Sequence, residues 1–260
     1  MVTIKDLNYS YKNREIFSNL NLEIKPGEFV FIVGKEASGK TTLVKILSGI
    51  INDKFNIKID NTDDINEIRK IMNVSFEGLN IFITDTVKEE LELKLKNLKM
   101  SKEIIDEEIK KISNELDLND LLECSPNNLS GGQKQLVKLA ATLIGNPKII
   151  ILDESTSMLD GVTKEKIYKY LKKLNRQNKT TIICTTNDMN DLVYGKRILI
   201  LNKNIIFDSK LNKAFDNEKV FKENDLELPF MASLSLKLKY YNLLDEVILD
   251  MNKMVNKLWK

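Results

Sequence analysis

The sequence predicts an α/β fold that is built on a mostly parallel β-sheet. Two segments, residues 29–33 and 149–152, consist almost entirely of apolar residues, as do strands that are buried on both faces. Segments with helical spacing follow, and alternating strands and helices are typical of a parallel sheet covered by helices on both faces. The length of 260 residues suits one large domain with an inserted subdomain and a short appendage.

The first part of the chain is expected to add antiparallel strands. Residues 2–11 and 17–24 carry alternating, β-rich patterns, and the Lys-Pro-Gly-Glu sequence at 25–28 is typical of a turn. A glycine-containing loop and a helix come directly after the buried strand at 29–33. We expect residues 66–75 to return to the sheet.

A helical subdomain is expected at about residues 78–145, inserted into the α/β core. Within it, residues 86–122 are rich in Lys, Glu, Leu and Ile at three- and four-residue spacing, and Ser101 suits the N-cap of the second of two helices. A further helix should run to about residue 144, because Gly145 lies where a C-terminal cap belongs.

The second half of the chain continues the alternation of strands and helices. We expect a helix and two strands at residues 162–176, 180–184 and 197–201. A hairpin should follow at Lys203-Asn204, because Asn tolerates the left-handed conformation that such turns need. Residues 209–260 are mainly helical and amphipathic, so we predict a core at 1–215 and a helical C-terminal extension at 216–260.

The composition excludes several classes of function. The net charge is only +2, from 40 basic and 38 acidic residues, so we expect no nucleic-acid partner. The absence of histidine rules out a histidine metal site or catalytic triad. Cys124 and Cys184 are too few for a disulfide framework. No apolar run approaches the roughly 18–20 residues that span a bilayer, and we expect no signal peptide at the N-terminus.

Residues 34–42 form a candidate phosphate-binding loop. They read Gly-Lys-Glu-Ala-Ser-Gly-Lys-Thr-Thr and fit G-x-x-x-x-G-K-[ST] between a buried strand and a helix. Backbone N–H groups of such a loop surround phosphates, a lysine places its charge on the β- and γ-phosphates, and a hydroxyl ligates Mg²⁺. We therefore predict ATP and Mg²⁺ as cofactors, Thr41 as a metal ligand, and nucleotide contacts from Gly34, Lys35, Glu36, Ala37, Ser38, Gly39, Lys40, Thr41 and Thr42. The alternative is a chance glycine turn.

An acidic pair ends the second buried strand. At the carboxyl end of that strand, Asp153 is placed to hold the Mg²⁺ shell, and Glu154 to orient or deprotonate the attacking water. The alternative is a solvated acidic pair at a strand terminus.

Leu129-Ser130-Gly131-Gly132-Gln133 resembles the signature sequence of ABC ATPases. The resemblance implies a P-loop NTPase core of RecA-like fold. It also implies a head-to-tail dimer in which each ATP lies between one subunit's phosphate loop and the other's signature. Residues 155–160 resemble the D-loop of this family, and Tyr11 matches the aromatic residue that stacks on adenine, although it could be a plain strand tyrosine. The nucleotide contacts that the resemblance adds are Tyr11, Ser130, Gly131, Gly132, Gln133 and Asp160.

Residues 153–160, Asp-Glu-Ser-Thr-Ser-Met-Leu-Asp, resemble one branch of the family. This branch comprises the energy-coupling factor ATPases, which are cytosolic subunits of vitamin and metal-ion importers. Leu-Glu-Leu-Pro-Phe at 226–230 is similar to the C-terminal segment of that branch, which helps to hold two ATPases together. The resemblance implies a peripheral ATPase at the cytoplasmic face of the membrane, with a second ATPase and a transmembrane subunit near residues 77–90 as partners. The alternatives are another ABC transporter branch, such as an exporter, or a nucleotide-binding subunit with little turnover.

Three positions depart from the family pattern. Glu77 stands where the family has a glutamine that contacts Mg²⁺ and the attacking water, and the segment after it is one residue short. Asn187 replaces the switch histidine, and Ala37 replaces a glycine of the phosphate loop. We assign catalytic roles to Glu77, Glu154 and Asn187, and a metal contact to Glu77. Because Asn cannot carry an imidazolium charge, the chain is predicted to be the catalytically weaker half of a heterodimer.

Overall fold

Two β-sheets form the framework of the protein. The computed structural model describes residues 1–53, 55–78 and 81–259. The six-stranded sheet has the order β5-β6-β7-β3-β8-β9, and the three-stranded sheet has the order β2-β1-β4. The strands are Val2–Tyr11 (β1), Arg14–Ile24 (β2), Phe29–Val33 (β3), Ile57–Ile59 (β4), Met72–Phe76 (β5), Ile149–Asp153 (β6), Thr181–Thr185 (β7), Arg197–Asn202 (β8) and Asn204–Lys210 (β9).

The larger sheet is parallel except for its last strand. Strands β5, β6, β7, β3 and β8 pair in parallel, and β9 pairs with β8 antiparallel. All residues of β3, β6 and β7 are buried. The predicted α/β fold with a mostly parallel sheet is therefore confirmed, as is the antiparallel sheet near the N-terminus.

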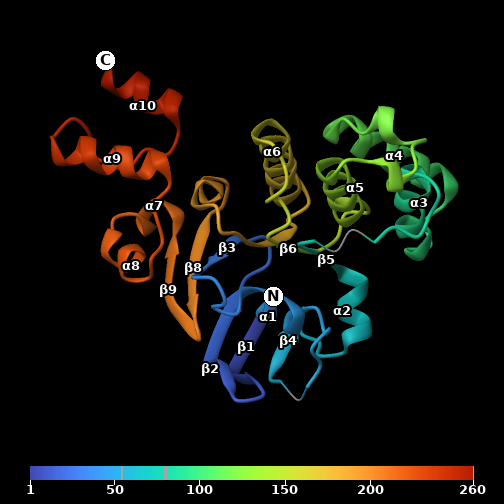
Figure 1. Ribbon diagram of the computed structural model, residues 1–260, viewed down its shortest axis with the longest axis horizontal. Coiled ribbons are helices and arrows are strands. Elements are labelled where there is room, and N and C mark those ends of the chain that lie inside the picture. The colour runs from blue at the N-terminus through green and yellow to red at the C-terminus, as the bar shows by residue number, and fades with distance from the viewer. Residues whose placement is uncertain (54, 79–80, 260) are drawn as a thin grey trace.

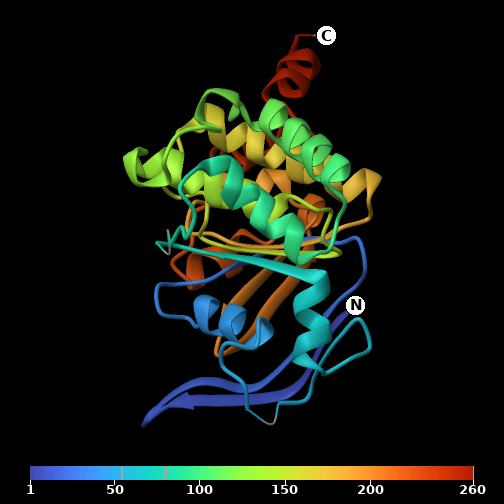
Figure 2. The same ribbon diagram turned by 90° about the vertical axis from the view of Figure 1, so that its right-hand side faces the viewer.

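Two hydrophobic cores lie on opposite faces of the larger sheet. In β3, Phe29 and Phe31 belong to the core that includes the helical subdomain, whereas Val30 and Ile32 belong to the core shared with the antiparallel sheet. Successive side chains of a strand point to opposite faces, so a single apolar strand supplies both cores. Figure 2 shows this arrangement in layers, with the larger sheet between the helical layer and the antiparallel sheet.

The helices cover the two faces of the larger sheet unequally. One face carries the helical subdomain and α6, and the other carries α1 and α2 (Figure 1). The helices of the core are Lys40–Leu47 (α1), Ile65–Ile71 (α2), Val87–Asn97 (α3), Lys102–Leu116 (α4), Gly131–Leu143 (α5) and Gly161–Gln177 (α6), with short 3-10 helices at Asn119–Leu121, Pro126–Asn128 and Met189–Tyr194.

The prediction that residues 66–75 form a strand is wrong for its first part. Residues 65–71 form the helix α2, and only Met72–Phe76 joins the sheet as β5. The Asp64 side chain accepts a hydrogen bond from the N–H of Asn66 and so caps this helix. Ile68 is buried in the core that the larger sheet shares with the antiparallel sheet. One face of this segment is therefore apolar, as in an amphipathic helix, and the strand prediction did not account for it.

One smaller prediction needs correction, and another is confirmed. The hairpin between β8 and β9 occurs as expected, but Lys203, with φ 57°, takes the left-handed conformation that was assigned to Asn204. Asn204 already belongs to β9, and its side-chain oxygen accepts a hydrogen bond from Ile205 N–H. Ser101 does occupy the N-cap of α4, yet its side chain makes no capping hydrogen bond with the described residues.

The C-terminal part of the chain is helical. It contains Leu211–Ala214 (α7), Glu218–Glu223 (α8), Phe230–Tyr240 (α9) and Met251–Leu258 (α10). Phe215 and Phe221 are buried in the main core, whereas Leu244, Ile248 and Met254 form a separate small cluster. Because Phe221 of the predicted extension packs in the main core, the boundary between core and extension at residue 215 stays a prediction. Within the described part of the chain, no helix combines the length and the apolar character needed to cross a membrane.

Candidate functional site

The phosphate-binding loop leads from β3 into α1, as its sequence predicted. Gly34 is tightly enclosed, because a Cβ there would lie 2.4 Å from the Leu201 carbonyl oxygen. Gly39 has φ +102°, and a Cβ would lie 2.8 Å from the Phe17 ring. Both glycines are thus required by the local geometry. Gly39 is followed directly by the first turn of α1.

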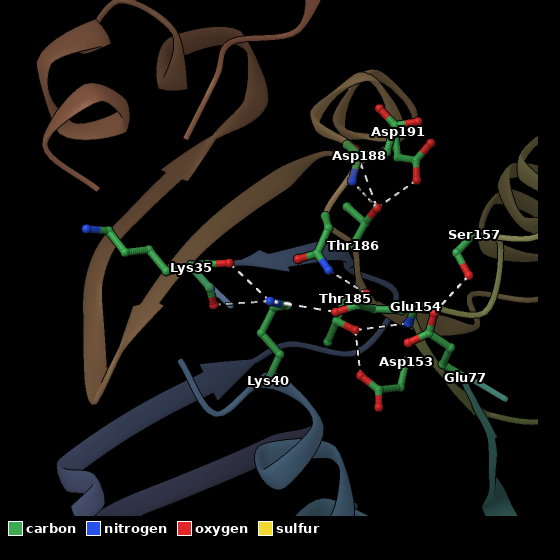
Figure 3. A network of polar contacts seen from close by, with 12 residues as sticks. Lys35, Lys40, Glu77, Asp153, Glu154, Ser157, Thr185, Thr186, Asp188 and Asp191 are labelled. Carbon is green, nitrogen blue, oxygen red and sulfur yellow. Dashed lines mark hydrogen bonds and ion pairs between the residues drawn. The ribbon is translucent and has the colours of Figure 1, made fainter. Parts of the chain in front are cut away.

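The buried amine of Lys40 lies at the centre of the loop. The residue is 5% exposed, and its Nζ donates hydrogen bonds to the carbonyl oxygens of Gly34 at 3.0 Å and Lys35 at 3.4 Å. The same nitrogen lies 3.7 Å from Oε1 of Glu154, and Figure 3 shows the two side chains facing each other from opposite sides of the site. A nearly buried ammonium group that is held by main-chain carbonyls is a fixed positive charge for an anionic ligand.

The loop offers hydrogen-bonding groups that have no partner among the described residues and could bind a triphosphate. The first N–H groups of α1 have no intrahelical partner, and no side chain of the described residues caps them. The Ser38 hydroxyl oxygen is buried and has no hydrogen-bond partner within the described residues. These groups fit the phosphates of a nucleotide, because an anion at a helix N-terminus is stabilised by unpaired N–H groups.

The acidic pair lies at the end of β6, next to the end of β7. Asp153 is 1% exposed, and its Oδ1 accepts a hydrogen bond of 2.7 Å from the Thr185 hydroxyl. The N–H of Glu154 contacts both the carbonyl and the hydroxyl oxygen of Thr185. Glu154 has φ 49°, a left-handed conformation that turns the chain sharply after the strand. The Glu154 side chain is thereby aimed across the sheet edge toward Lys40.

Two further predicted site residues, Asn187 and Glu77, contact Glu154 and the loop that follows it. Asn187 Nδ2 donates to Glu154 Oε2 at 2.6 Å, and Ser157 donates to Glu77 Oε1 at 3.1 Å. Burial raises the pKa of the Glu154 carboxyl; the Lys40 charge lowers it, and the charges of Glu77 and Asp153 raise it further. A carboxyl group with a raised pKa that is held toward the phosphate loop suits the role of a proton acceptor.

The segment that carries Asn187 is held by an ion-pair network. Lys164 of α6 lies 2.7 Å from an oxygen of Asp188 and 2.8 Å from one of Asp191. The Thr186 hydroxyl also donates to Asp191 (Figure 3). These bonds flank Asn187 on both sides along the chain, so the amide that contacts Glu154 has a fixed support.

These groups surround one cavity of about 470 Å³. Its lining combines residues from the hairpin, the phosphate loop and three strand ends, namely Tyr11, Arg14, Ile16, Glu36, Ala37, Gly39, Lys40, Thr41, Thr42, Glu77, Glu154 and Asn187. Ten of these twelve residues had been predicted as site residues, whereas Arg14 and Ile16 had not. Gly34, Lys35, Ser38 and Asp153 belong to the same loop and strand end without lining the cavity.

Arg14 could have been found from the hairpin pattern. Tyr11 and Arg14 pair across the turn between β1 and β2, so the two side chains belong to neighbouring strands at the mouth of the cavity. Arg14 also donates to the Ala37 carbonyl at 3.4 Å. The alternating pattern predicts a second strand that begins only at residue 17, so it does not place Arg14 opposite Tyr11.

The signature residues lie outside this cavity. The Ser130 hydroxyl accepts a hydrogen bond from the Gln133 N–H, and the Gln133 side chain accepts one from the Ser130 N–H, which is a capping box at the start of α5. Ser130 and Gly131 are exposed, and a Cβ on Gly131 would have no described atom within 4 Å. Asp160 likewise caps α6 through the N–H groups of its first turn. None of these groups lines the cavity of the same chain.

Replacing Ala37 by Gly is expected to raise the melting temperature by about 1–3 °C. Ala37 has φ 58°, a left-handed conformation in which a Cβ is unfavourable and a glycine is not. Thermal unfolding of the nucleotide-free chain measures the effect. Ala141→Gly within α5 is the matched control and should lower the melting temperature, because its backbone is helical. A loss of stability in Ala37→Gly would contradict the prediction.

Comparison with known sequences agrees with this geometry. The profile of a family described as ABC transporter matches residues 17–157. The chain is 34% identical to the energy-coupling factor transporter ATP-binding protein EcfA1 of Oenococcus oeni, with 100% of this chain and 98% of the relative aligned. It is 32% identical to EcfA1 of Fusobacterium nucleatum, with 100% of this chain and 99% of the relative aligned.

Solved structures give the same fold. The dimeric ATP-binding cassette MJ0796, in a post-hydrolysis state with ADP and Pi, superposes with a TM-score of 0.72 at 34% identity, covering 81% of this chain and 99% of that one. The protein cbiO1 of Clostridium perfringens, described as part of the ABC transporter complex cbiONQ, superposes with a TM-score of 0.74 at 26% identity. That match covers 90% of this chain and 97% of cbiO1.

Proposed function

The chain belongs to the ABC transporter family, and from this premise we propose that it is the ATP-binding, ATP-hydrolysing subunit of an importer of the energy-coupling factor type. The observation that carries the proposal is the approach of Lys40 Nζ to within 3.7 Å of Glu154 Oε1 across the cavity. A cation for the phosphates and a carboxylate for the attacking water thus face each other where a γ-phosphate would lie.

The same site is suited to Mg²⁺. The predicted ligands Thr41, Asp153 and Glu77 offer only oxygen atoms, which is the chemistry that this hard cation prefers. Mg²⁺ usually takes one or two carboxylates together with substrate phosphates instead of an all-protein cage. When bound, the ion would neutralise charge that develops on the phosphates. We propose that Tyr11 and Arg14, which line the cavity, contact the nucleoside end.

A head-to-tail dimer completes the ATP site. The first turn of α5, with the exposed Ser130 and Gly131 and the half-buried Gly132, would approach the phosphate of a partner subunit. We assign this chain to an asymmetric heterodimer, because Glu77 and Asn187 depart from the family pattern while the signature is intact. In that pair the faster site would join this chain's signature to the other subunit's phosphate loop.

The remaining surfaces suit assembly with a transporter. Ile81 and Ile83 are 76% and 74% exposed. They belong to the segment at 77–90 that we assign to contact with a transmembrane subunit; Leu79 and Asn80 of this segment lie outside the described residues. The C-terminal extension exposes large apolar side chains that suit contact between the two ATPases, among them Phe230, Tyr240, Tyr241, Leu243 and Trp259. We place the protein peripherally at the cytoplasmic face of the membrane.

Thermal unfolding with and without nucleotide tests the proposed binding. Mg·ATP at about 100 times its dissociation constant should raise the melting temperature by about 5–10 °C, because a ligand that binds only the folded chain stabilises it by mass action. Mg²⁺ alone and ATP with a chelator are the controls. An unchanged melting temperature at millimolar Mg·ATP would contradict the proposal, and phosphate release by the complex with its partner measures hydrolysis.

A further inference from the structure

Polar side chains join helix α5 to the strands that carry the ATP site of its own chain. The proposed function gives these side chains no role. The Asn73 amide of β5 donates to the Thr142 carbonyl at 2.8 Å, near the end of α5. In the middle of α5, Lys138 Nζ donates to the Phe76 carbonyl. One turn earlier, Gln135 Nε2 donates to the Ser155 carbonyl at 2.6 Å. The last two acceptors directly precede Glu77 and directly follow Glu154.

The strand register places the ends of β5 and β6, from which these two acceptors follow, side by side. Strands β5 and β6 are parallel neighbours in which Phe76 pairs with Asp153. Glu77 and Glu154 therefore leave the sheet at adjacent strand ends. The Ser155 hydroxyl donates to the Ser75 carbonyl at 2.9 Å, which links the two ends once more. A helix that binds both ends can set the spacing between the two glutamates.

The two α5 side chains are unusually placed for polar residues. Gln135 is 2% exposed, and the only hydrogen bond described for its side chain is the one to Ser155. Lys138 is half-buried, and burial lowers the pKa of its amine, while the Asp153 charge acts in the opposite direction. Removing a polar group from water is unfavourable unless its bonds compensate, so these contacts are part of the local structure.

The positive charge of Lys138 also offsets repulsion among nearby carboxylates. Three carboxylates, those of Glu77, Asp153 and Glu154, lie at the adjacent ends of β5 and β6, where Phe76 pairs with Asp153. Lys40 faces Glu154 from one side, and Lys138 adds a positive charge on the side of α5. Because like charges repel strongly where water is scarce, a second cation helps to hold the carboxylates together.

We propose that Lys138 and Gln135 are positioning residues, which fix Glu77 and Glu154 to the helix whose first turn is the signature. This inference rests on the proposed function for the roles of the two glutamates. Its consequence is mechanical: the helix that begins with the signature is tied to the strand ends that carry the acidic residues of the chain's own site. A shift of α5 is passed to Glu77 and Glu154 through two side chains, one helical turn apart.

Hydrogen exchange of the full-length, nucleotide-free chain tests this coupling. Lys138→Met keeps the apolar stem but removes the donor and the charge. Amides at 72–78 and 153–157 should then exchange about tenfold faster, and the melting temperature should fall by about 3–6 °C. Lys138→Arg should restore both. Lys110→Met, which changes an exposed lysine of α4, should change neither.

Introducing Lys138→Met into a Glu77→Gln variant separates the effect of charge from the effect of packing. Glu77→Gln removes one carboxylate, so it should recover part of the melting temperature lost in Lys138→Met, whereas equal losses in both backgrounds would refute charge compensation. Unchanged exchange at the two strand ends, or a uniform rise that includes α6, would overturn the positioning role. If Lys138→Met does not fold, Lys138→Gln gives the same comparison without charge. Failure of the chain to bind Mg·ATP would contradict the proposed function instead, because the exchange measurement uses no nucleotide.

Discussion

Replacing Lys40 by Ala is expected to weaken Mg·ATP binding by about 10²–10³-fold. The amine is nearly buried and is held by the carbonyls of Gly34 and Lys35, so its charge is directed into the cavity and is poorly screened by water. Its removal leaves phosphate charge that Mg²⁺ alone must balance in a partly desolvated site. Titration of the purified chain with a fluorescent ATP analogue in the presence of Mg²⁺ measures the loss.

Lys35→Ala is the matched control for this variant. Lys35 lies in the same loop, but its amine points away from the cavity (Figure 3) and lies 2.6 Å from an oxygen of the exposed residue Asp225. An exposed ion pair contributes little, so nucleotide affinity should change by less than about fivefold. Equal losses in Lys35→Ala and Lys40→Ala would show that general charge, and not the position of Lys40, determines binding.

Replacing Ser130 by Arg is expected to reduce the ATPase rate of the assembled pair by at least about 10²-fold. The exposed first turn of α5 would approach the partner's phosphate, and a long side chain there blocks that approach. Glu154→Gln in this chain should cause a much smaller loss, because the site with Glu77 and Asn187 is predicted to be the slower one. Phosphate release by the purified pair measures both variants.

Two controls accompany this comparison. Ser130→Arg also removes a helix cap, which costs about 1 kcal/mol, so its melting temperature must be measured. Ser101→Arg introduces the same side chain at the N-cap of α4, where the serine makes no capping bond with the described residues, and should leave the rate unchanged. Equal losses in Ser130→Arg and Glu154→Gln would refute the asymmetry of the two sites.

Motifs and buried strands were accessible from the sequence. Residues 29–33 and 149–153 form β3 and β6, and the loop between β3 and α1 has the position that its glycines indicated. These features depend on residues that are close along the chain. Apolar runs identify strands, and a glycine pattern identifies a turn, because both reflect local backbone and burial preferences.

Features that depend on neighbouring strands were less accessible. Arg14 escaped notice because its role follows from its pairing with Tyr11. Helix α2 was mistaken for part of a strand because its single buried residue, Ile68, leaves only a weak helical pattern. The contact of Asn187 with Glu154 could not be read from either segment alone, since β7 had first to be placed beside β6.

A phosphate loop, an acidic strand end and a signature helix are each encoded within a few consecutive residues, so the kind of chemistry can be predicted from the amino-acid sequence. Which side chains meet is a property of the tertiary structure. It brought Lys40 to Glu154, set Glu77 beside Glu154 through the register of β5 and β6, and tied α5 to both strand ends through Lys138 and Gln135. The physical reason is that strand order and helix packing follow from burial of the whole core, which no local pattern specifies.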